Sequence, residues 1–151
     1  MEDGCNADRH AGRSLRMVRS LPFELTTNKW RGLMPDKHSR IVPEGRAVWY
    51  TERLWECAAG LPVQTIAIAD IPEFEQDCWF GTRLPTCREV AKHAKLIMNA
   101  DLSYPIILSA DGGLMDGGHR ISKAWINGMV ELQAVRFVID PEPDYVIPGE
   151  K

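Results

Sequence analysis

Two consecutive glycines, Gly117 and Gly118, separate a short apolar segment from an amphipathic one, and this arrangement strongly limits how the chain can fold. Leu114 and Met115 before the glycines suit a strand, and the residues after them repeat apolar side chains at helical spacing. Glycine adopts positive φ angles without steric cost and lets other groups approach the backbone closely. We therefore predict a strand that turns sharply into a helix, with both glycines at the junction.

The rest of the chain contains further segments with the periodicity of helices or strands, and Gly or Pro residues end most of them. A capping box formed by Thr86 and Glu89 marks the start of the clearest helix. The expected elements are a helix at residues 47–59, a strand at 63–69, a helix at 86–100, a strand at 106–109, a turn at 111–113, a strand at 114–115, a helix at 119–127 and a strand at 131–139. A mixed sheet flanked by helices suits this order, so we predict a single small α+β domain.

Charge is unevenly distributed along the chain. Residues 1–46 contain nine Lys or Arg and six Asp or Glu, whereas residues 47–151 contain nine and fifteen, which together give the net charge of −3. The basic part has little apolar periodicity, so we expect residues 1–46 to be a flexible or loosely docked extension, unless it reflects an arbitrary start of the sequence. Residues 47–140 then form the domain, and the proline-containing residues 141–151 form a non-regular tail.

Composition and cysteine usage limit the class of protein. The hydrophobic content of 44% argues against wholesale disorder, and the net charge of −3 gives no global basic field that would attract DNA or anionic lipid. None of the four cysteines lies in a C-x-x-C pair or at zinc spacing from a histidine, which fits a reduced, cytoplasmic protein. No segment approaches the ~20 apolar residues of a membrane span, so we expect no membrane partner.

The glycine junction also carries groups that bind anions. The first turn of the predicted helix would offer unpaired N–H donors and the positive end of the helix dipole. Arg120 can hold a phosphate through two parallel hydrogen bonds, His119 can donate a proton or a hydrogen bond, and Lys123 lies one turn further on. The alternative is a plain strand-to-helix turn in which Arg120 pairs with an acidic neighbour such as Asp116.

The stretch YPIILSADGGLMDGGHRISKAWINGMVELQAVRF, residues 104–137, resembles the ParB amino-terminal/sulfiredoxin superfamily. The shared pattern is Pro-Ile, a short strand, a glycine turn, an apolar-Asp-Gly-x-His-Arg motif, a short helix that ends in Gly, and an apolar strand. With the expected strand and helix upstream, the resemblance covers roughly residues 63–139. It implies a nucleotide triphosphate, ATP or CTP with Mg²⁺, whose phosphates contact Gly117, Gly118, His119 and Arg120.

The chain departs from two groups within this superfamily. Sulfiredoxins have Cys immediately before the His-Arg pair, where this chain has Gly118, so we expect no cysteine-based reduction of sulfinic acids. Full partition proteins continue into a helix-turn-helix domain and a dimerising tail, and few residues remain here after residue 139. We therefore expect no operator-type DNA binding.

Three functions follow as hypotheses. The first is a stand-alone nucleotide- or phosphate-binding domain with ATPase or phosphotransferase activity, in which His119 and Asp116 are catalytic and Lys123 supports the glycines and Arg120 in binding. The second is a non-catalytic DNA-associated module that uses the basic residues 1–46. The third is a nuclease. The sequence leaves open whether the protein is an enzyme, and its oligomeric state.

Several other residues have both a functional and a structural interpretation. Asp116 either orients His119 or binds a divalent metal beside phosphate, or it caps the following helix. One carboxylate of the run at residues 73–77 serves as a general base, or the run is a solvated loop. The amino end of the helix at residues 86–100 is a second phosphate contact, or its basic residues form a solvated face. We expect His93 to lie on the surface or in packing. The remaining aromatic and sulfur side chains expected in the core are Trp49, Trp55, Trp79, Trp125, Cys57 and Cys87.

Overall fold

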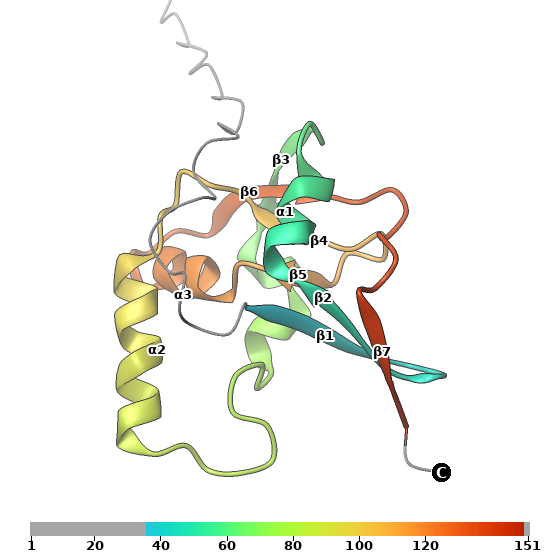
Figure 1. Ribbon diagram of the computed structural model, residues 1–151. Coiled ribbons are helices and arrows are strands. Elements are labelled where there is room, and N and C mark those ends of the chain that lie inside the picture. The colour runs from blue at the N-terminus through green and yellow to red at the C-terminus, as the bar shows by residue number, and fades with distance from the viewer. Residues whose placement is uncertain (1–35, 150–151) are drawn as a thin grey trace, which may run out of the picture.

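The computed structural model describes residues 36–149, which form three α-helices, seven strands and two short 3₁₀ helices (Figure 1). The strands are β1 (Lys37–Val42), β2 (Gly45–Tyr50), β3 (Val63–Ala67), β4 (Ile106–Leu108), β5 (Leu114–Asp116), β6 (Glu131–Arg136) and β7 (Tyr145–Pro148). The helices are α1 (Thr51–Ala58), α2 (Cys87–Asn99) and α3 (Gly118–Ile126), and the 3₁₀ helices are η2 (Ile68–Asp70) and η3 (Pro72–Glu75). None of these helices is both long and apolar enough to cross a membrane.

The larger sheet has four strands in the order β3-β6-β4-β5. β6 pairs antiparallel with β3 and parallel with β4, and β4 pairs antiparallel with β5 through a turn at residues 109–113. A sheet with both kinds of pairing, flanked by helices, confirms the predicted mixed α+β fold. The connection between β4 and β5 confirms the predicted turn at Asp111-Gly112-Gly113.

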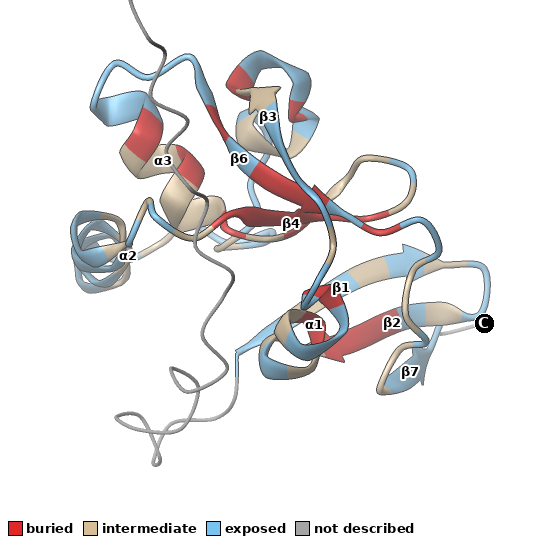
Figure 2. Cartoon of the chain, turned by 90° about the horizontal axis from the view of Figure 1, so that it is seen from above, coloured by how far each residue is buried: buried red, intermediate tan, exposed pale blue. Residues whose placement is uncertain are grey.

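The core lies on both faces of this sheet. Successive residues of a strand point to opposite faces, so Ile107 of β4 packs on one side while Ile106 and Leu108 pack on the other. The first side is covered by α1 and β2, and the second by α3 and the two 3₁₀ helices. Figure 2 shows buried residues gathered in β2, β4 and β6 and on the side of α3 that meets the sheet.

The smaller sheet corrects the predicted helix at residues 47–59. Its first four residues, Ala-Val-Trp-Tyr, belong to strand β2, and helix α1 begins only at Thr51. β2 pairs antiparallel with β1 and, on its other side, with β7, so the sheet order is β1-β2-β7. β-branched and aromatic side chains suit a strand whose residues pack against the core, and here Ala47, Val48 and Trp49 are buried. Pairing with distant segments therefore decides the structure of this stretch.

Both predicted domain boundaries separate strands that pair with each other in this sheet. The boundary after residue 46 cuts the β1–β2 hairpin, so residues 37–46 belong to the folded unit and are not a flexible extension. Residues 1–35 lie outside the described residues. The tail predicted to be non-regular contains β7, which pairs with β2 from Gly45 to Val48. β1 and β7 both stabilise β2, because each of them is hydrogen-bonded to one of its two sides.

Three elements differ in detail from the sequence-based expectation. The strand expected at residues 63–69 ends at Ala67 and continues as η2, and the strand expected at 131–139 ends at Arg136. Helix α2 has the predicted capping box, but none of its side chains is buried. It lies outside α3 (Figures 1 and 2), so its apolar stripe is only partly covered, and Met98 is 74% exposed.

Candidate functional site

The junction between β5 and α3 has the predicted strand–glycine–helix form. Gly117 is the N-cap residue of α3 and has a φ angle of 118°, in the left-handed region that favours glycine. A Cβ atom at this position would lie 2.4 Å from Cγ2 of Ile106, so the close packing of the junction on β4 also requires glycine. No side chain of the described part of the chain caps α3, and its first intrahelical hydrogen bond runs from the Ile121 N–H to the Gly117 carbonyl. The N–H groups of the first turn are thus available to an anion.

His119, in this first turn, is joined to a second histidine from helix α2. Nδ1 of His93 and Nε2 of His119 lie 3.0 Å apart, within hydrogen-bond distance. Both imidazole rings stack on the indole of Trp79, with ring centroids 4.7 Å from it for His93 and 4.9 Å for His119. The indole also lies against Gly118, where a Cβ atom would be 3.5 Å from its Nε1. Trp79 therefore fixes the orientation of both imidazoles beside the amino end of α3.

His119 favours its neutral form. Burial lowers the pKa of His119, and the nearby His93 lowers it further, while Asp116 and Asp36 act in the opposite direction. The hydrogen bond between the rings needs one imidazole to donate its N–H and the other to accept it. A second positive charge on the pair would bring two like charges together. His119 is therefore suited to accept a proton, because its lowered pKa keeps it neutral.

Asp116 and Arg120 form an ion pair across one turn of backbone. Nη2 of Arg120 donates a hydrogen bond to Oδ2 of Asp116 at 2.5 Å, and the two side chains are 15% and 25% exposed. The guanidinium carbon of Arg120 lies 4.8 Å from the ring centroid of Trp55. Nε of Arg120 is buried and has no hydrogen-bond partner among the described residues. The pairing that we gave as the structural alternative for Arg120 is therefore present, although it uses only part of the guanidinium.

Arg120 also borders a cavity of about 270 Å³ at the same end of the sheet. The cavity is lined by Tyr104 before β4, by Thr65 of β3, and by Glu131 and Gln133 of β6. Nε2 of Gln133 donates to Oγ1 of Thr65 at 3.0 Å, which orders the polar part of this lining. Arg120 is thus part of the first turn of α3 and also lines this cavity.

Contrary to the prediction, Lys123 does not lie in the site. Its Nζ donates hydrogen bonds to the carbonyl oxygens of Met98 at 2.9 Å and Ala100 at 2.7 Å. These carbonyls end α2, and a cation there satisfies acceptors that no helical N–H can reach. Lys123 therefore anchors α2 to α3 and has a structural role.

The other candidates from the sequence are separated from this junction. The amino end of α2 is closed by its own capping box, and Arg83 forms an ion pair with Glu89 of that box, which leaves little room for a phosphate. Asp77 accepts hydrogen bonds from the N–H groups of Trp79 and Phe80, so it shapes the loop that carries Trp79. Glu73 lines a different cavity, described below.

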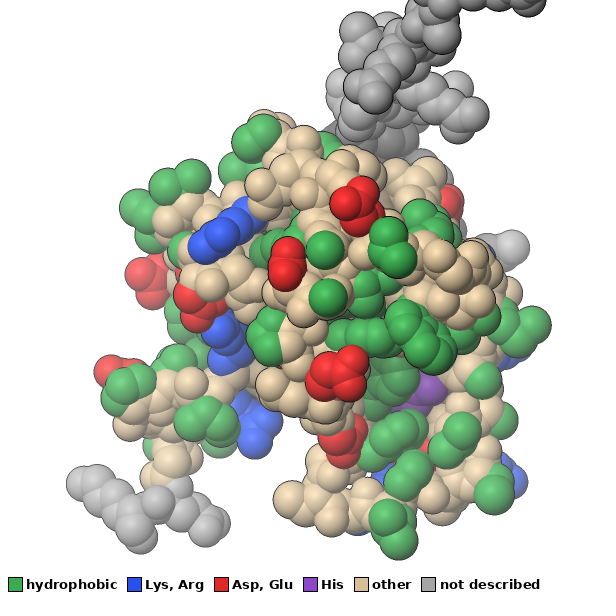
Figure 3. Space-filling view, turned by 180° about the vertical axis from the view of Figure 1, so that it is seen from behind, with side chains coloured by type: hydrophobic (Ala, Val, Ile, Leu, Met, Phe, Trp, Pro, Cys, Tyr) green, Lys and Arg blue, Asp and Glu red, His purple; other side chains and the backbone are tan. Residues whose placement is uncertain are grey.

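Two predictions about buried side chains are wrong. Trp125 is 61% exposed on the outer side of α3, and Cys57 and Cys87 are both exposed. Figure 3 shows, from behind, hydrophobic side chains gathered over the middle and right of the molecule, next to histidine atoms. Helical spacing alone cannot distinguish a core position from such an exposed apolar one.

Three residues near the glycine junction were not expected there from the sequence: His93, Trp79 and His38. His38 of β1 is close enough to Asp116 for that charge to affect its pKa, and its Nε2 is buried without a hydrogen-bond partner among residues 36–149. The only sequence signal for His93 was its position on a helix that precedes the glycine junction. His38 gave no signal, because it lies in the segment expected to be flexible.

The ion pair leads to a stability prediction for Arg120→Ala. We expect the substitution to lower the free energy of unfolding by about 2 kcal/mol, because it leaves the partly buried Asp116 carboxylate without its partner and removes the contact with Trp55. Urea denaturation without ligand measures this. The same substitution in an Asp116→Asn background should cost clearly less; equal costs in the two backgrounds would show that the ion pair contributes nothing.

Comparisons with known proteins add no relative to this description. A scan against protein-family models found no match, and searches of curated proteins and of solved structures found no significant similarity. The functional interpretation therefore depends on the chain's own residues and their geometry.

Proposed function

We propose that this protein binds a nucleoside triphosphate, ATP or CTP, through its phosphates at the amino end of α3. The observation that carries the proposal is the uncapped first turn of α3, which combines free N–H groups with His119 and with an arginine that borders a cavity. Helix amino termini with these groups are common phosphate sites.

Arg120 supports this proposal through its unused donors. Among residues 36–149, its one hydrogen-bonded carboxylate is Asp116, and Nε has no partner. A phosphate can therefore bind the guanidinium beside Asp116 or replace it, and charge-assisted bonds to phosphate are strong enough for either. The adjoining cavity of about 270 Å³ offers space for the part of a ligand next to its phosphates.

The histidine pair supplies the chemistry that a phosphotransferase or ATPase needs. An attacking hydroxyl or water must lose a proton, and His119 has a lowered pKa and a partner that fixes its orientation. We infer that His119 accepts this proton while Trp79 keeps the ring in place.

Mg²⁺ would arrive with the nucleotide. Among residues 36–149, no group of three or more His, Cys, Asp or Glu side chains is arranged to hold a metal ion. Mg²⁺ usually binds one or two carboxylates together with substrate phosphates and water. Asp116 fits the role of that single carboxylate, at the end of β5 beside the first turn of α3. The ion would supply charge neutralisation at the phosphates.

The test is calorimetric titration of the full chain with ATP, ADP and CTP, with and without Mg²⁺, on wild type and Gly118→Ala. A methyl group at Gly118 meets Trp79 at ordinary contact distance, and alanine favours a helix, so the variant should keep its stability. The methyl group leans toward the amino end of α3 and obstructs ligand approach. We expect nucleotide affinity to fall by roughly tenfold or more, equivalent to about 1.4 kcal/mol.

The matched control is Gly128→Ala at the other end of α3. Gly128 has a φ angle of 73°, and no atom of residues 36–149 beyond its chain neighbours lies within 4 Å of its Cβ position, so this variant should lose stability but bind nucleotide like wild type. Equal affinity in wild type and Gly118→Ala, or no nucleotide binding at millimolar concentration, would contradict the proposal. Steeply salt-dependent DNA binding without nucleotide binding would favour the DNA-associated alternative.

A further inference from the structure

A second and larger cavity than the one beside Arg120 lies at the opposite end of the four-stranded sheet from the glycine junction. β4 begins at Ile106, against Gly117, and ends at Leu108, which lines this cavity. The cavity has a volume of about 620 Å³ and is open to solvent on one side, which is within the size range of small-ligand sites. It is separate from the proposed nucleotide site, and the following inference is independent of that proposal.

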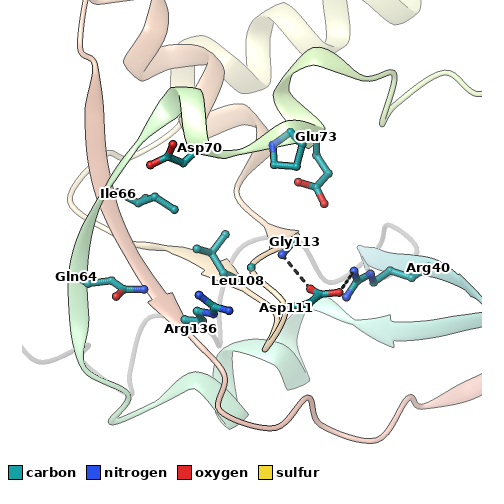
Figure 4. Close-up of a pocket in the computed structure, with 11 residues that line it drawn as sticks. Arg40, Gln64, Ile66, Asp70, Glu73, Leu108, Asp111, Gly113 and Arg136 are labelled. Atoms are coloured by element: carbon teal, nitrogen blue, oxygen red, sulfur yellow. Dashed lines mark hydrogen bonds and ion pairs between the residues drawn. The ribbon is translucent and has the colours of Figure 1, made fainter.

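The cavity has an apolar floor and charged walls. Figure 4 shows Ile66 and Leu108 in its middle, with Asp70 and Glu73 on one side and Arg136 on the other. Leu108 is only 1% exposed, so this floor continues into the hydrophobic core. The walls come from η2, η3 and the end of β6, and the core fixes the positions of all three.

One of the two arginines in the lining is already neutralised. Nη2 of Arg40 lies 2.8 Å from Oδ2 of Asp111, and Nη1 of Arg40 lies 3.8 Å from Oδ2 of Asp140. Asp111 also accepts the N–H of Gly113, which fixes the turn between β4 and β5 (Figure 4). Arg40 and Asp111 therefore close one corner of the cavity and leave no free charge for a ligand.

The other charges of the cavity form no ion pair among the described residues, although Arg40 lies close enough to Glu73 for the two charges to attract each other. Arg136 donates hydrogen bonds to the carbonyl oxygen of Ala110, at 3.2 Å from Nε and at 2.5 Å from Nη2, and forms no ion pair with any residue that the structure describes. Within residues 36–149, Asp70 and Glu73 form no ion pair either, and Oε2 of Glu73 is buried without a hydrogen-bond partner. A buried carboxylate oxygen without a donor is unfavourable, so a ligand N–H there would be stabilising.

Gly113 makes room for this arrangement. A Cβ atom at Gly113 would lie 2.9 Å from Oε1 of Glu73 and 3.0 Å from Nη2 of Arg40. The missing side chain thus lets Glu73 approach the turn, where its carboxylate faces the cavity corner (Figure 4).

We infer that this cavity binds a small zwitterion whose ammonium group and carboxylate are separated by a short aliphatic chain, of the ω-amino acid class. The ammonium group contacts Glu73, the carboxylate contacts Arg136, and the aliphatic chain lies on Leu108 between them. The ligand needs a positive and a negative group because Arg136 lies on the opposite wall of the cavity and forms no ion pair with Asp70 or Glu73. The apolar floor between them explains the aliphatic spacer.

The test uses 4-aminobutyrate and 6-aminohexanoate as probes, with butylamine and butyrate as ligands that each carry one of the two charges. Amide and side-chain NMR signals of the full chain are followed at low salt. We expect at least one zwitterion to shift the signals of Gly112, Gly113 and the Gln64 side chain, with an affinity roughly tenfold above both single-charge ligands. Equal binding of butylamine, or no localised shift with either zwitterion, would overturn the inference.

Variants identify the wall that holds the ammonium group. Glu73→Gln keeps the size of the side chain and should weaken zwitterion binding by roughly tenfold, whereas Glu75→Gln on the same 3₁₀ helix, outside the cavity lining, should leave it unchanged. Melting temperatures of both variants check that they fold. Equal effects of the two substitutions would show that the probes respond to general negative charge and would overturn the assignment.

Discussion

Replacing Gly117 with alanine is expected to lower the free energy of unfolding by about 3–4 kcal/mol. A non-glycine residue in the left-handed region costs about 1–2 kcal/mol, and Gly117 has a φ angle of 118°. The new Cβ atom would also lie 2.4 Å from Cγ2 and 2.8 Å from Cβ of Ile106, which is fully buried, and such overpacking adds about 1–3 kcal/mol. Urea denaturation monitored by tryptophan fluorescence measures the loss.

Gly128→Ala separates the two contributions. Gly128 also has a positive φ angle, of 73°, but no other group in the described residues lies within 4 Å of its Cβ position. This substitution should therefore cost only the backbone strain, about 1–2 kcal/mol. If Gly117→Ala and Gly128→Ala lose the same stability, the contact between the glycine junction and β4 is not as tight as the structure shows.

Acidification is expected to destabilise the protein through His38. Burial and the charge of Arg40 lower the pKa of His38 from 6.5 to about 4, while Asp116 and Asp140 act in the opposite direction. Between these two pKa values the unfolded state binds more protons than the folded state. The contribution is therefore fully present above pH 6.5 and is lost as the pH falls toward 4. Between about pH 7 and about pH 4.5 we expect a loss of about 2.5 kcal/mol from this residue.

His38→Phe tests the assignment to this residue. Phenylalanine does not titrate and retains an aromatic ring against Trp49, whose ring centroid lies 5.7 Å from that of His38. Denaturation curves at several pH values should show a much smaller decrease of stability for the variant than for wild type. His119 also has a lowered pKa, so part of the pH dependence should remain. Parallel curves for the two proteins would assign the effect to groups other than His38.

The glycine junction and the turn at Asp111-Gly112-Gly113 were predictable because their signals are local. A helix start depends on the residues within about one turn of it, and the Thr86–Glu89 capping box is present as expected. Gly117 and Gly112 both adopt positive φ angles, which few other residues tolerate. The order of strands and helices between residues 63 and 136 followed from the same kind of signal.

Residues 37–50 could not be assigned in this way. The Ala-Val-Trp-Tyr stretch is compatible with the start of a helix, and it becomes a strand because β1 and β7 pair with its two sides. β7 lies about a hundred residues further along the chain, and the periodicity of neither segment predicts that the two pair. Tertiary packing overrides local propensity where the two are close in energy.

The candidate site divides in the same way. The sequence by itself determined that Gly117, Gly118, His119 and Arg120 lie at the start of a helix, because neighbouring residues specify that turn. Only the tertiary structure decided what these side chains contact: His119 meets His93, Arg120 meets Asp116 and Trp55, and Lys123 leaves the site for the end of α2. The walls of the large cavity, from β1 to β6, also come together only on folding. Apart from the Asp116–Arg120 pair, these contacts join residues far apart in the sequence, and they are selected by how the helices and sheets pack.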